Sequence, residues 1–375
     1  MSSRNPSNLP SVAVVGATGA VGREMLAVLE QRRFPHASIR AFASAKSAGE
    51  RLPYRGGEIV VETLTQEALA GVDIALFSAG SGISKQFGPS AAAAGTIIID
   101  NSSAFRMNEG VPLVIPEVNA PAMASLVGAN RSAHERGGTR VGGIIANPNC
   151  SAIIMMVALD PVRRAFGIER IIVSTYQAAS GAGAKGMAEL ESQTRAVLSG
   201  GEAVPEFFHE PYAFNLFSHN TAVDPERGLN VEEIKMIEES QKIWGDPGLR
   251  LSPTCIRVPV LRAHSESINV TLKRPASLKE FRAVFEKAPG VQLVDDRAAN
   301  RFPTPLKASG GDDVLVGRIR PDFSAPDGEA AMGRSGERLL AFNLFVSGDQ
   351  LRKGAALNAV QIAELLGRRH LKKAA

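Results

Sequence analysis

The chain has 375 residues, 44% of them hydrophobic, and its net charge is only +4 at pH 7. A length of this order favours two domains over one. The basic residues are interspersed with acids, which argues against nucleic-acid binding, and no apolar run approaches the roughly 20 residues that span a bilayer. The first ten residues lack the apolar core of a signal peptide, and two cysteines cannot build a disulfide framework. We therefore expect a soluble cytoplasmic protein without membrane or nucleic-acid partners.

The first part of the chain alternates short apolar strands with helical stretches. Runs rich in β-branched residues predict strands at 11–16, 38–44, 58–62, 72–80 and 96–100. A helix is predicted over 23–34, and further crossovers are predicted around 66–70 and 84–94. Strands that alternate with crossovers indicate a parallel sheet covered on both faces.

After residue 150 the pattern changes to longer strands. Strand-like runs occur at 170–180, 251–261, 266–272 and 339–347, with helices predicted at 185–198 and 231–244. This alternation is typical of an α+β domain with a larger sheet. Segments 126–143 and 318–337 are rich in Gly, Ser and charge, and we predict exposed loops there. The amphipathic last helix, 354–370, is expected to pack back on the first domain.

A glycine-rich turn follows the first predicted strand. In "VVGATGAVGRE", Gly16, Gly19 and Gly22 lie between strand 11–16 and the next helix. Glycines allow a tight turn and a close approach of the backbone to a pyrophosphate, which the helix N-terminus attracts. The spacing is G-x-x-G-x-x-G, and the alternative is a purely structural turn. Its place in a βαβ pattern predicts a dinucleotide site in a Rossmann-like domain.

The end of the second strand bears on which dinucleotide binds. NAD sites usually have an acid there that accepts from the ribose 2′-OH. This chain instead reads "ASAKSAG", with Ser44, Lys46 and Ser47 and no acid before Glu50. A cation and hydroxyls suit a 2′-phosphate, although an isolated lysine can also be a solvated loop residue. The sequence therefore favours NADP.

One of the two cysteines lies at the start of a predicted helix. Cys150 follows Pro148 and Asn149 and precedes the apolar run "SAIIMMVALDPVRRAF". The helix dipole and unpaired N–H groups there stabilise a thiolate, and the same N–H groups can hold an oxyanion. The alternative is a buried thiol that fills space, as expected for Cys255 in "PTCIRVPV". Polar neighbours on both sides favour Cys150 as a nucleophile.

A thiolate enzyme commonly needs an acid–base partner. Of six histidines, His264 is the best candidate because it comes seven residues after Arg257, where a strand runs into a loop. An arginine on a strand of Val and Pro needs an anionic partner, such as a substrate carboxylate. The sequence has no Cys/His cluster that suggests a metal site.

Nine short strings, in one order along nearly the whole chain, resemble the aspartate-β-semialdehyde dehydrogenase family. They read "GATGAVG", "FASAKSAG", "DNSSAFR", "PEVN", "NPNCS", "YQAASGAG", "EEIKM", "RVPVLRAHSE" and "DQLRKGAALNAVQIAE". The resemblance implies an enzyme that uses NADPH to convert L-4-aspartyl phosphate to L-aspartate 4-semialdehyde and phosphate, through a cysteine thioester. The step would feed lysine and diaminopimelate, methionine and threonine biosynthesis. It also implies a Rossmann-like parallel-sheet domain followed by an α+β catalytic and dimerisation domain.

The resemblance implies roles for individual residues. Cys150 would be the nucleophile, His264 the acid–base residue, and Gln177 the group that orients the reacting centre. Substrate contacts would come from Arg257 (α-carboxylate), Glu232 (ammonium), and Arg106, Lys235 and Asn149 (phosphate). The cofactor would lie on Gly16, Thr18, Gly19, Ala20, Val21, Gly22, Lys46, Ser47, Ser180, Gly181 and Gln350. The family usually has Asn at the position of Gln350, and no metal is expected.

Domain boundaries are expected at 1–147 for NADP binding, 148–353 for catalysis and dimerisation, and 354–375 for a C-terminal helix that returns to the first domain. The resemblance implies a homodimer.

The nearest alternative, N-acetyl-γ-glutamyl-phosphate reductase, typically has Gly before its cysteine and an aromatic-Pro pair after it, whereas Asn149 and Ser151 flank Cys150 here. A non-catalytic NADP-binding protein of the same fold is the other alternative, and the presence of both Cys150 and His264 argues against it.

Overall fold

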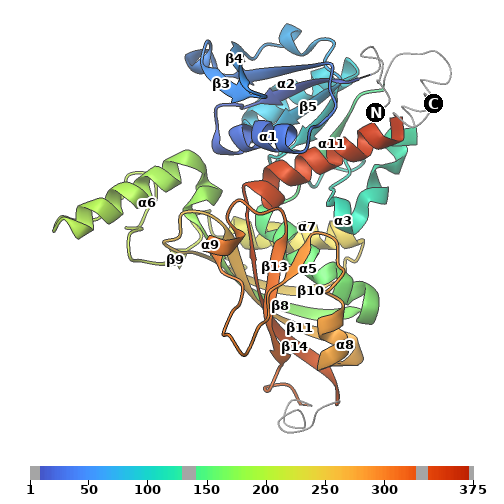
Figure 1. Cartoon of the computed structure of the whole chain (residues 1–375), viewed down its shortest axis with the longest axis vertical. Helices are drawn as coiled ribbons and strands as arrows, with labels where there is room; N and C mark the ends of the chain where they lie inside the picture. The colour runs from blue at the N-terminus through green and yellow to red at the C-terminus, as the bar shows by residue number, and fades with distance from the viewer. Residues whose placement is uncertain (1–8, 129–140, 327–336, 371–375) are drawn as a thin grey trace. The chain divides into compact units, whose positions relative to one another are not determined.

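The computed structural model describes residues 9–128, 141–326 and 337–370 (Figure 1). The chain divides into two compact units, one formed by Met1–Pro148 with Ala355–Ala375 and the other by Asn149–Gly354. Most of the two predicted loops, namely residues 129–140 and 327–336, lies outside the described residues. In the part of the chain that is described, no helix is both long and apolar enough to cross a membrane.

The first unit contains a seven-stranded sheet in the order β3-β4-β2-β1-β5-β6-β7. Its strands are β1 (Ser11–Val15), β2 (Ser38–Ala43), β3 (Arg51–Tyr54), β4 (Gly57–Thr63), β5 (Ile74–Phe77), β6 (Ile97–Asp100) and β7 (Gly143–Ala146). All neighbours pair in parallel except β3, which is antiparallel to β4. The strand order reverses between β2 and β5 on either side of β1, and such a switch point is where doubly wound sheets bind ligands.

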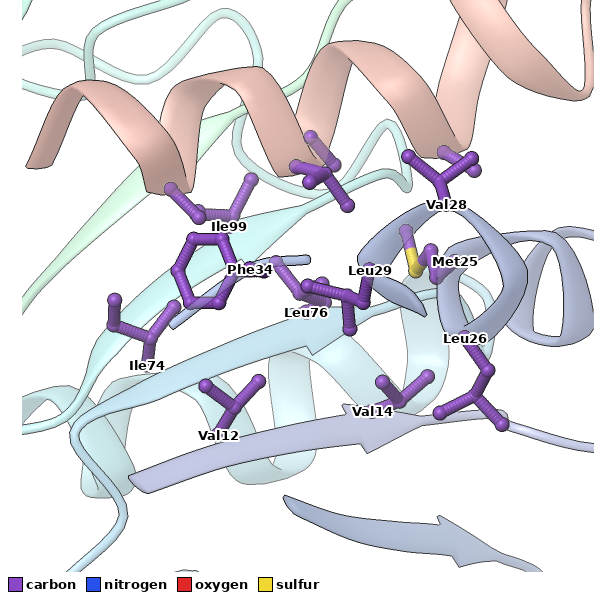
Figure 2. Close-up of a cluster of buried hydrophobic side chains, with 14 of the residues drawn as sticks. Val12, Val14, Met25, Leu26, Val28, Leu29, Phe34, Ile74, Leu76 and Ile99 are labelled. Atoms are coloured by element: carbon purple, nitrogen blue, oxygen red, sulfur yellow. The ribbon is translucent and has the colours of Figure 1, made fainter. Parts of the chain in front are cut away.

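Both faces of this sheet are buried, as a parallel sheet requires. Val12 and Val14 of β1 face one apolar cluster, while Ala13 and Val15 face another. The first cluster includes Met25 and Leu29 of α1 (Ala20–Gln31) together with side chains of the C-terminal helix α11 (Leu357–His370). Figure 2 shows these side chains between the strands and the helices. Helix α2 (Ser81–Ala93) covers the other face.

The second unit contains a mixed seven-stranded sheet in the order β12-β13-β14-β11-β8-β10-β9. Its strands are β8 (Ile168–Gln177), β9 (Phe217–Ser218), β10 (Arg250–Arg257), β11 (His264–Ser277), β12 (Val291–Leu293), β13 (Val314–Pro321) and β14 (Arg338–Gly348). β8 is parallel to β10 and antiparallel to β11. These two sheets confirm the predicted fold class of a parallel-sheet domain joined to an α+β domain.

Three boundaries of the predicted loops were wrong. Residues 126–128 end a helical segment, and Leu126 and Val127 pack against the core of the first unit. Residues 318–321 form the end of β13, which pairs with β14 through an irregularity between Gly317 and Arg320. Gly143 begins β7, the edge strand of the first sheet. Backbone pairing to a neighbouring strand holds these polar segments in the sheets, and composition alone does not reveal such pairing.

Helices cover one face of the second sheet. Helix α5 (Cys150–Phe166) is buried from Ser151 to Asp160 and packs with α7 (Val231–Trp244) against β8, β10 and β11. Helix α6 (Gly183–Leu198) follows β8. Side chains of β8 alternate, so Ile171 and Val173 face the helices whereas Ile172 and Tyr176 are 40% and 36% exposed on the opposite face.

Candidate active site

Cys150 is the first residue of α5, as the sequence indicated. Its predecessor Asn149 caps the helix, and the Asn149 Oδ1 atom accepts hydrogen bonds from the backbone N–H groups of Ser151 at 3.0 Å and Ala152 at 3.1 Å. The cap thereby satisfies donors that helix starts leave unpaired. Cys150 is half-buried, whereas Cys255 is buried within β10, where desolvation raises the pKa of its thiol. Of the two thiols, Cys150 is the one suited to react.

Three predicted site residues lie side by side on adjacent strands. Gln177 ends β8 and pairs in register with Arg257, the last residue of β10. The pairing of Ser265 with Tyr176 places His264, the first residue of β11, beside Gln177 on the other side. All three side chains are buried. We call Arg257, Gln177 and His264 the polar row.

The hydrogen bonds of His264 determine which ring nitrogen carries its proton. The backbone N–H of Ala178 donates to His264 Nδ1 at 3.0 Å, so Nδ1 is an acceptor and the neutral ring is protonated on Nε2. Burial, assisted by the charge of Arg257, holds the pKa of His264 well below its usual value. Among the described residues Nε2 has no hydrogen-bond partner, and a Cβ on Gly181 would approach within 3.0 Å of it. His264 is therefore a neutral ring with an Nε2–H donor directed toward Gly181.

Arg257 is held in place by two hydrogen bonds and lies over the Phe208 ring, 6.0 Å from its centroid. Its Nε donates to Asn220 Oδ1 at 3.1 Å and its Nη1 donates to the carbonyl of Ala178 at 2.9 Å. A guanidinium has five N–H donors, and five less these two leaves three for a carboxylate. Sequence reasoning missed Asn220, because no local pattern marks a loop amide as the support of an arginine on another strand.

Glu232 is a buried residue in the first turn of α7, and its carboxylate contacts three polar side chains. Its Oε1 accepts from Asn149 Nδ2 at 2.7 Å and from Gln177 Nε2 at 3.4 Å, and its Oε2 lies 3.5 Å from Lys235 Nζ. Burial opposes the ionisation of Glu232, but the charges of His219 and Lys235 and the Asn149 amide lower its pKa to about 2. Glu232 is thus an anion at neutral pH, as a partner for a substrate ammonium must be.

Gln177 and Gln350 link further predicted residues of the second unit. Gln177 Nε2 donates to Ser151 Oγ at 2.7 Å, which ties β8 to the first turn of α5. Gln350 donates to Ser180 Oγ and accepts from the backbone N–H of Ala263 at 2.9 Å, next to His264. Glutamine at position 350 therefore holds two loops that border the polar row.

The glycine turn of the first unit has the geometry that a phosphate loop requires. Gly16 has φ +81°, and a Cβ there would lie 2.5 Å from the carbonyl oxygen of Ser78. A Cβ on Gly22 would collide with the Gly16 carbonyl, so only glycine lets α1 approach the end of β1. Thr18 and Gly19 precede α1, which begins at Ala20 and Val21. This region fits a bound pyrophosphate.

The other predicted residues of the first unit lie in two places. Lys46 and Ser47 form a short 3₁₀ turn, Ala45–Ser47, directly after β2. Arg106 is buried, with its Nε donating to Asn147 O and its Nη2 to Asn101 O, both at 2.9 Å. Within the described residues, no group of three or more His, Cys, Asp or Glu side chains could hold a metal ion.

Comparison with known proteins identifies the family of this chain. Residues 11–126 match the family described as "Semialdehyde dehydrogenase, NAD binding domain", and residues 159–353 match "Semialdehyde dehydrogenase, dimerisation domain". Aspartate-semialdehyde dehydrogenase of Synechocystis is 45% identical over 355 residues, covering 95% of this chain and 96% of the relative. The chain belongs to the aspartate-semialdehyde dehydrogenase family. The resemblance read from the nine strings is confirmed.

Other members of the family are similar over the same length. The aspartate-semialdehyde dehydrogenase of Bacillus subtilis is 43% identical over 368 residues, covering 96% of this chain and 98% of the relative. A crystal structure of aspartate semialdehyde dehydrogenase II from Vibrio cholerae, complexed with ASA, superposes with a TM-score of 0.85 at 41% identity. It covers 96% of this chain and 98% of that one. The family is one of oxidoreductases with a nicotinamide cofactor, and both domains are present here.

Proposed function

We propose that this protein is an NADP-dependent aspartate-semialdehyde dehydrogenase that interconverts L-4-aspartyl phosphate with L-aspartate 4-semialdehyde and phosphate. The observation that carries the proposal is the arrangement of Cys150, at a capped helix start, with a polar row that offers a cation and an Nε2–H donor. Membership of the family supports it. Its place would be in the biosynthesis of amino acids of the aspartate group.

Cys150 performs the covalent step. Its thiolate attacks the acyl carbon of aspartyl phosphate, forming the S–C bond as the C–O bond to phosphate breaks. The dipole of α5 stabilises the thiolate, whereas the N–H groups of Ser151 and Ala152 stay bonded to the Asn149 cap and do not bind the oxyanion. Arg106 and Lys235 neutralise the departing phosphate. In the reverse direction phosphate attacks the same thioester.

His264 donates a hydrogen bond to the acyl oxygen as negative charge develops there. Because its Nδ1 is occupied by the Ala178 N–H, its Nε2–H is the atom that donates to this oxygen. Bound NADPH would supply the hydride that reduces the thioester. The aldehyde is released when the C–S bond breaks and Cys150 returns as thiolate, with Gln177 orienting the reacting group.

The substrate's amino-acid end would be recognised by two buried charges. The three remaining donors of Arg257 fit the α-carboxylate in a planar fork. Glu232, ionised at neutral pH, would accept from the ammonium group. The two groups belong to different elements, β10 and α7. Together they would select a substrate with an α-carboxylate and an α-ammonium group and fix its orientation.

NADP is proposed in preference to NAD. The tight glycine turn at Gly16 and Gly22 suits the pyrophosphate, and the turn after β2 offers Lys46 and Ser47 where an NAD site would place an acid. Ser180, Gly181 and Gln350 would complete the cofactor contacts from the second domain. The domain limits 1–147, 148–353 and 354–375 are proposed with these roles.

A homodimer in the cytoplasm is proposed as the working form. The face of the second sheet opposite α5 carries exposed Ile172 and Tyr176, and Tyr176 pairs with Phe345 at 6.1 Å between ring centroids. Apolar and aromatic side chains on an open sheet face favour burial in an interface. The reducing cytoplasm keeps an unpaired thiol such as Cys150 in its reduced, nucleophilic form.

The test is turnover by the purified protein. Phosphate-dependent reduction of NADP should occur with L-aspartate 4-semialdehyde and not with N-acetylglutamate semialdehyde. Activity with the acetylated substrate alone would identify an N-acetyl-γ-glutamyl-phosphate reductase. Activity with neither, alongside NADP binding, would identify a non-catalytic binding protein.

A further inference from the structure

Helix α7 directs three buried carboxylates toward the two cysteine-bearing segments. Glu232 and Glu239 both bind Asn149, the residue before Cys150, whereas Glu233 accepts from the backbone N–H of Cys255 at 2.9 Å. Glu232 and Glu239 are seven residues apart, which is close to two helical turns, so they share one stripe of α7. The predicted site included only Glu232 and Lys235 from this helix.

The bond from Glu239 is made to the backbone itself. Glu239 Oε2 accepts from the Asn149 N–H at 2.6 Å, and the Glu239 side chain is only 1% exposed. The Asn149 side chain is occupied on both ends, by Glu232 at Nδ2 and by the first turn of α5 at Oδ1. Asn149, the residue directly before the nucleophile, is therefore held from α7 at two points, its backbone N–H and its side-chain amide.

We propose that Glu239 is a positioning residue for Cys150. The Glu239 carboxyl lies in front of the start of α5, and its Oε2 supplies the acceptor for the buried Asn149 N–H. Without an acceptor, the buried Asn149 N–H would be left unpaired, and the turn would shift to find a partner. Such a shift moves Cys150 relative to the polar row. The kinetic part of this inference rests on the proposed function.

The test compares three substitutions on α7. Glu239→Met removes the acceptor at similar length, and Glu239→Gln keeps an acceptor oxygen. Glu233→Met removes a comparable bond to the backbone N–H of Cys255 together with the capping bond from the Asn230 N–H. For Glu239→Met, kcat should fall about 10- to 100-fold while KM for semialdehyde and phosphate stays within about twofold. Glu239→Gln should restore most of kcat. Glu233→Met should lower Tm at least as much as Glu239→Met and leave kcat within about threefold of wild type.

Iodoacetamide labelling of Cys150, followed by mass spectrometry of its peptide, provides a readout that needs no turnover. The rate at which iodoacetamide labels Cys150 should differ from wild type in Glu239→Met and return toward the wild-type rate in Glu239→Gln. Wild-type kcat and labelling in Glu239→Met, or losses in Glu239→Met and Glu233→Met that simply follow Tm, would overturn the proposal. If wild type lacks turnover, the proposed function fails, and the labelling rates still decide the role of Glu239.

Should Glu239→Met not fold, Glu239→Asp takes its place. Aspartate keeps the charge but is one methylene shorter, so it cannot span the 2.6 Å contact without moving the backbone. Lower kcat with unchanged KM in Glu239→Asp supports the positioning role, and wild-type kcat overturns it.

Discussion

Replacing Arg257 with lysine separates charge from geometry at the proposed carboxylate site. The guanidinium is buried and donates hydrogen bonds to Asn220 and to the Ala178 carbonyl. A lysine ammonium keeps the positive charge but cannot make both contacts and also fork onto a carboxylate. The Arg257→Lys variant should therefore bind the amino-acid substrate poorly while the rest of the polar row stays in place.

The size of the effect follows from the bonds that are lost. A hydrogen bond to a charged group contributes about 1.5–3 kcal/mol, and breaking one side of a buried charged pair costs about 2–5 kcal/mol. The expected fall in kcat/KM for semialdehyde is then roughly 30- to 5,000-fold. Arg262→Lys is a matched control, because Arg262 pairs with Asp349 at 2.7 Å in the loop before His264 and has no proposed substrate contact.

The assay is steady-state NADP reduction with semialdehyde and phosphate varied independently. Arg257→Lys should raise KM for semialdehyde, whereas Lys235→Ala, at the proposed phosphate site, should raise KM for phosphate. Wild-type constants for Arg257→Lys, or the same defect toward both substrates in the two variants, would refute the assignment of separate anion sites.

Three further predictions concern the nucleophile, the cofactor and stability. Cys150→Ser should abolish turnover while NADP still binds, and Cys255→Ser should keep most activity; turnover in Cys150→Ser would exclude its role. Wild type should prefer NADP to NAD in kcat/KM, and Lys46→Asp should erode that preference by repelling the 2′-phosphate; equal constants for both cofactors in wild type would contradict this. Because the folded pKa of Glu232 lies near 2, below the ordinary 4.5, its ionised form stabilises the fold above pH 4.5 and that stability is lost as pH falls toward 2. The difference in unfolding free energy between wild type and Glu232→Gln should shrink by about 3 kcal/mol over that range, and a constant difference would count against an ionised, paired carboxylate.

Features with local causes were read correctly from the sequence. The amphipathic run at 231–244 is helix α7, and the apolar run after Asn149 is helix α5. A glycine turn after a buried strand signals its own geometry, since the backbone at Gly16 excludes other residues. In each case the residues that determine the structure are neighbours in the chain.

Features that depend on pairing between distant segments needed the tertiary structure. Strand β3 has only four residues and contains a proline, and the end of β13 carries two arginines, so their pairing with β4 and β14 is what identifies them as strands. Arg257 and His264 lie beside Gln177 only because of the register in which the three strands pair. A shift of one residue in that register would move a side chain to the opposite face of the sheet.

The sequence by itself determined the fold class and the family, because these depend on patterns carried by short stretches of chain, and it predicted Cys150 rather than Cys255 as the nucleophile. Only the tertiary structure decided which supporting groups hold the site. Glu239 lies 90 residues from Asn149, in a helix where its neighbour Glu238 is chemically identical. The packing of α7 on the start of α5 distinguishes the two, since it buries Glu239 against a backbone N–H and leaves Glu238 partly exposed.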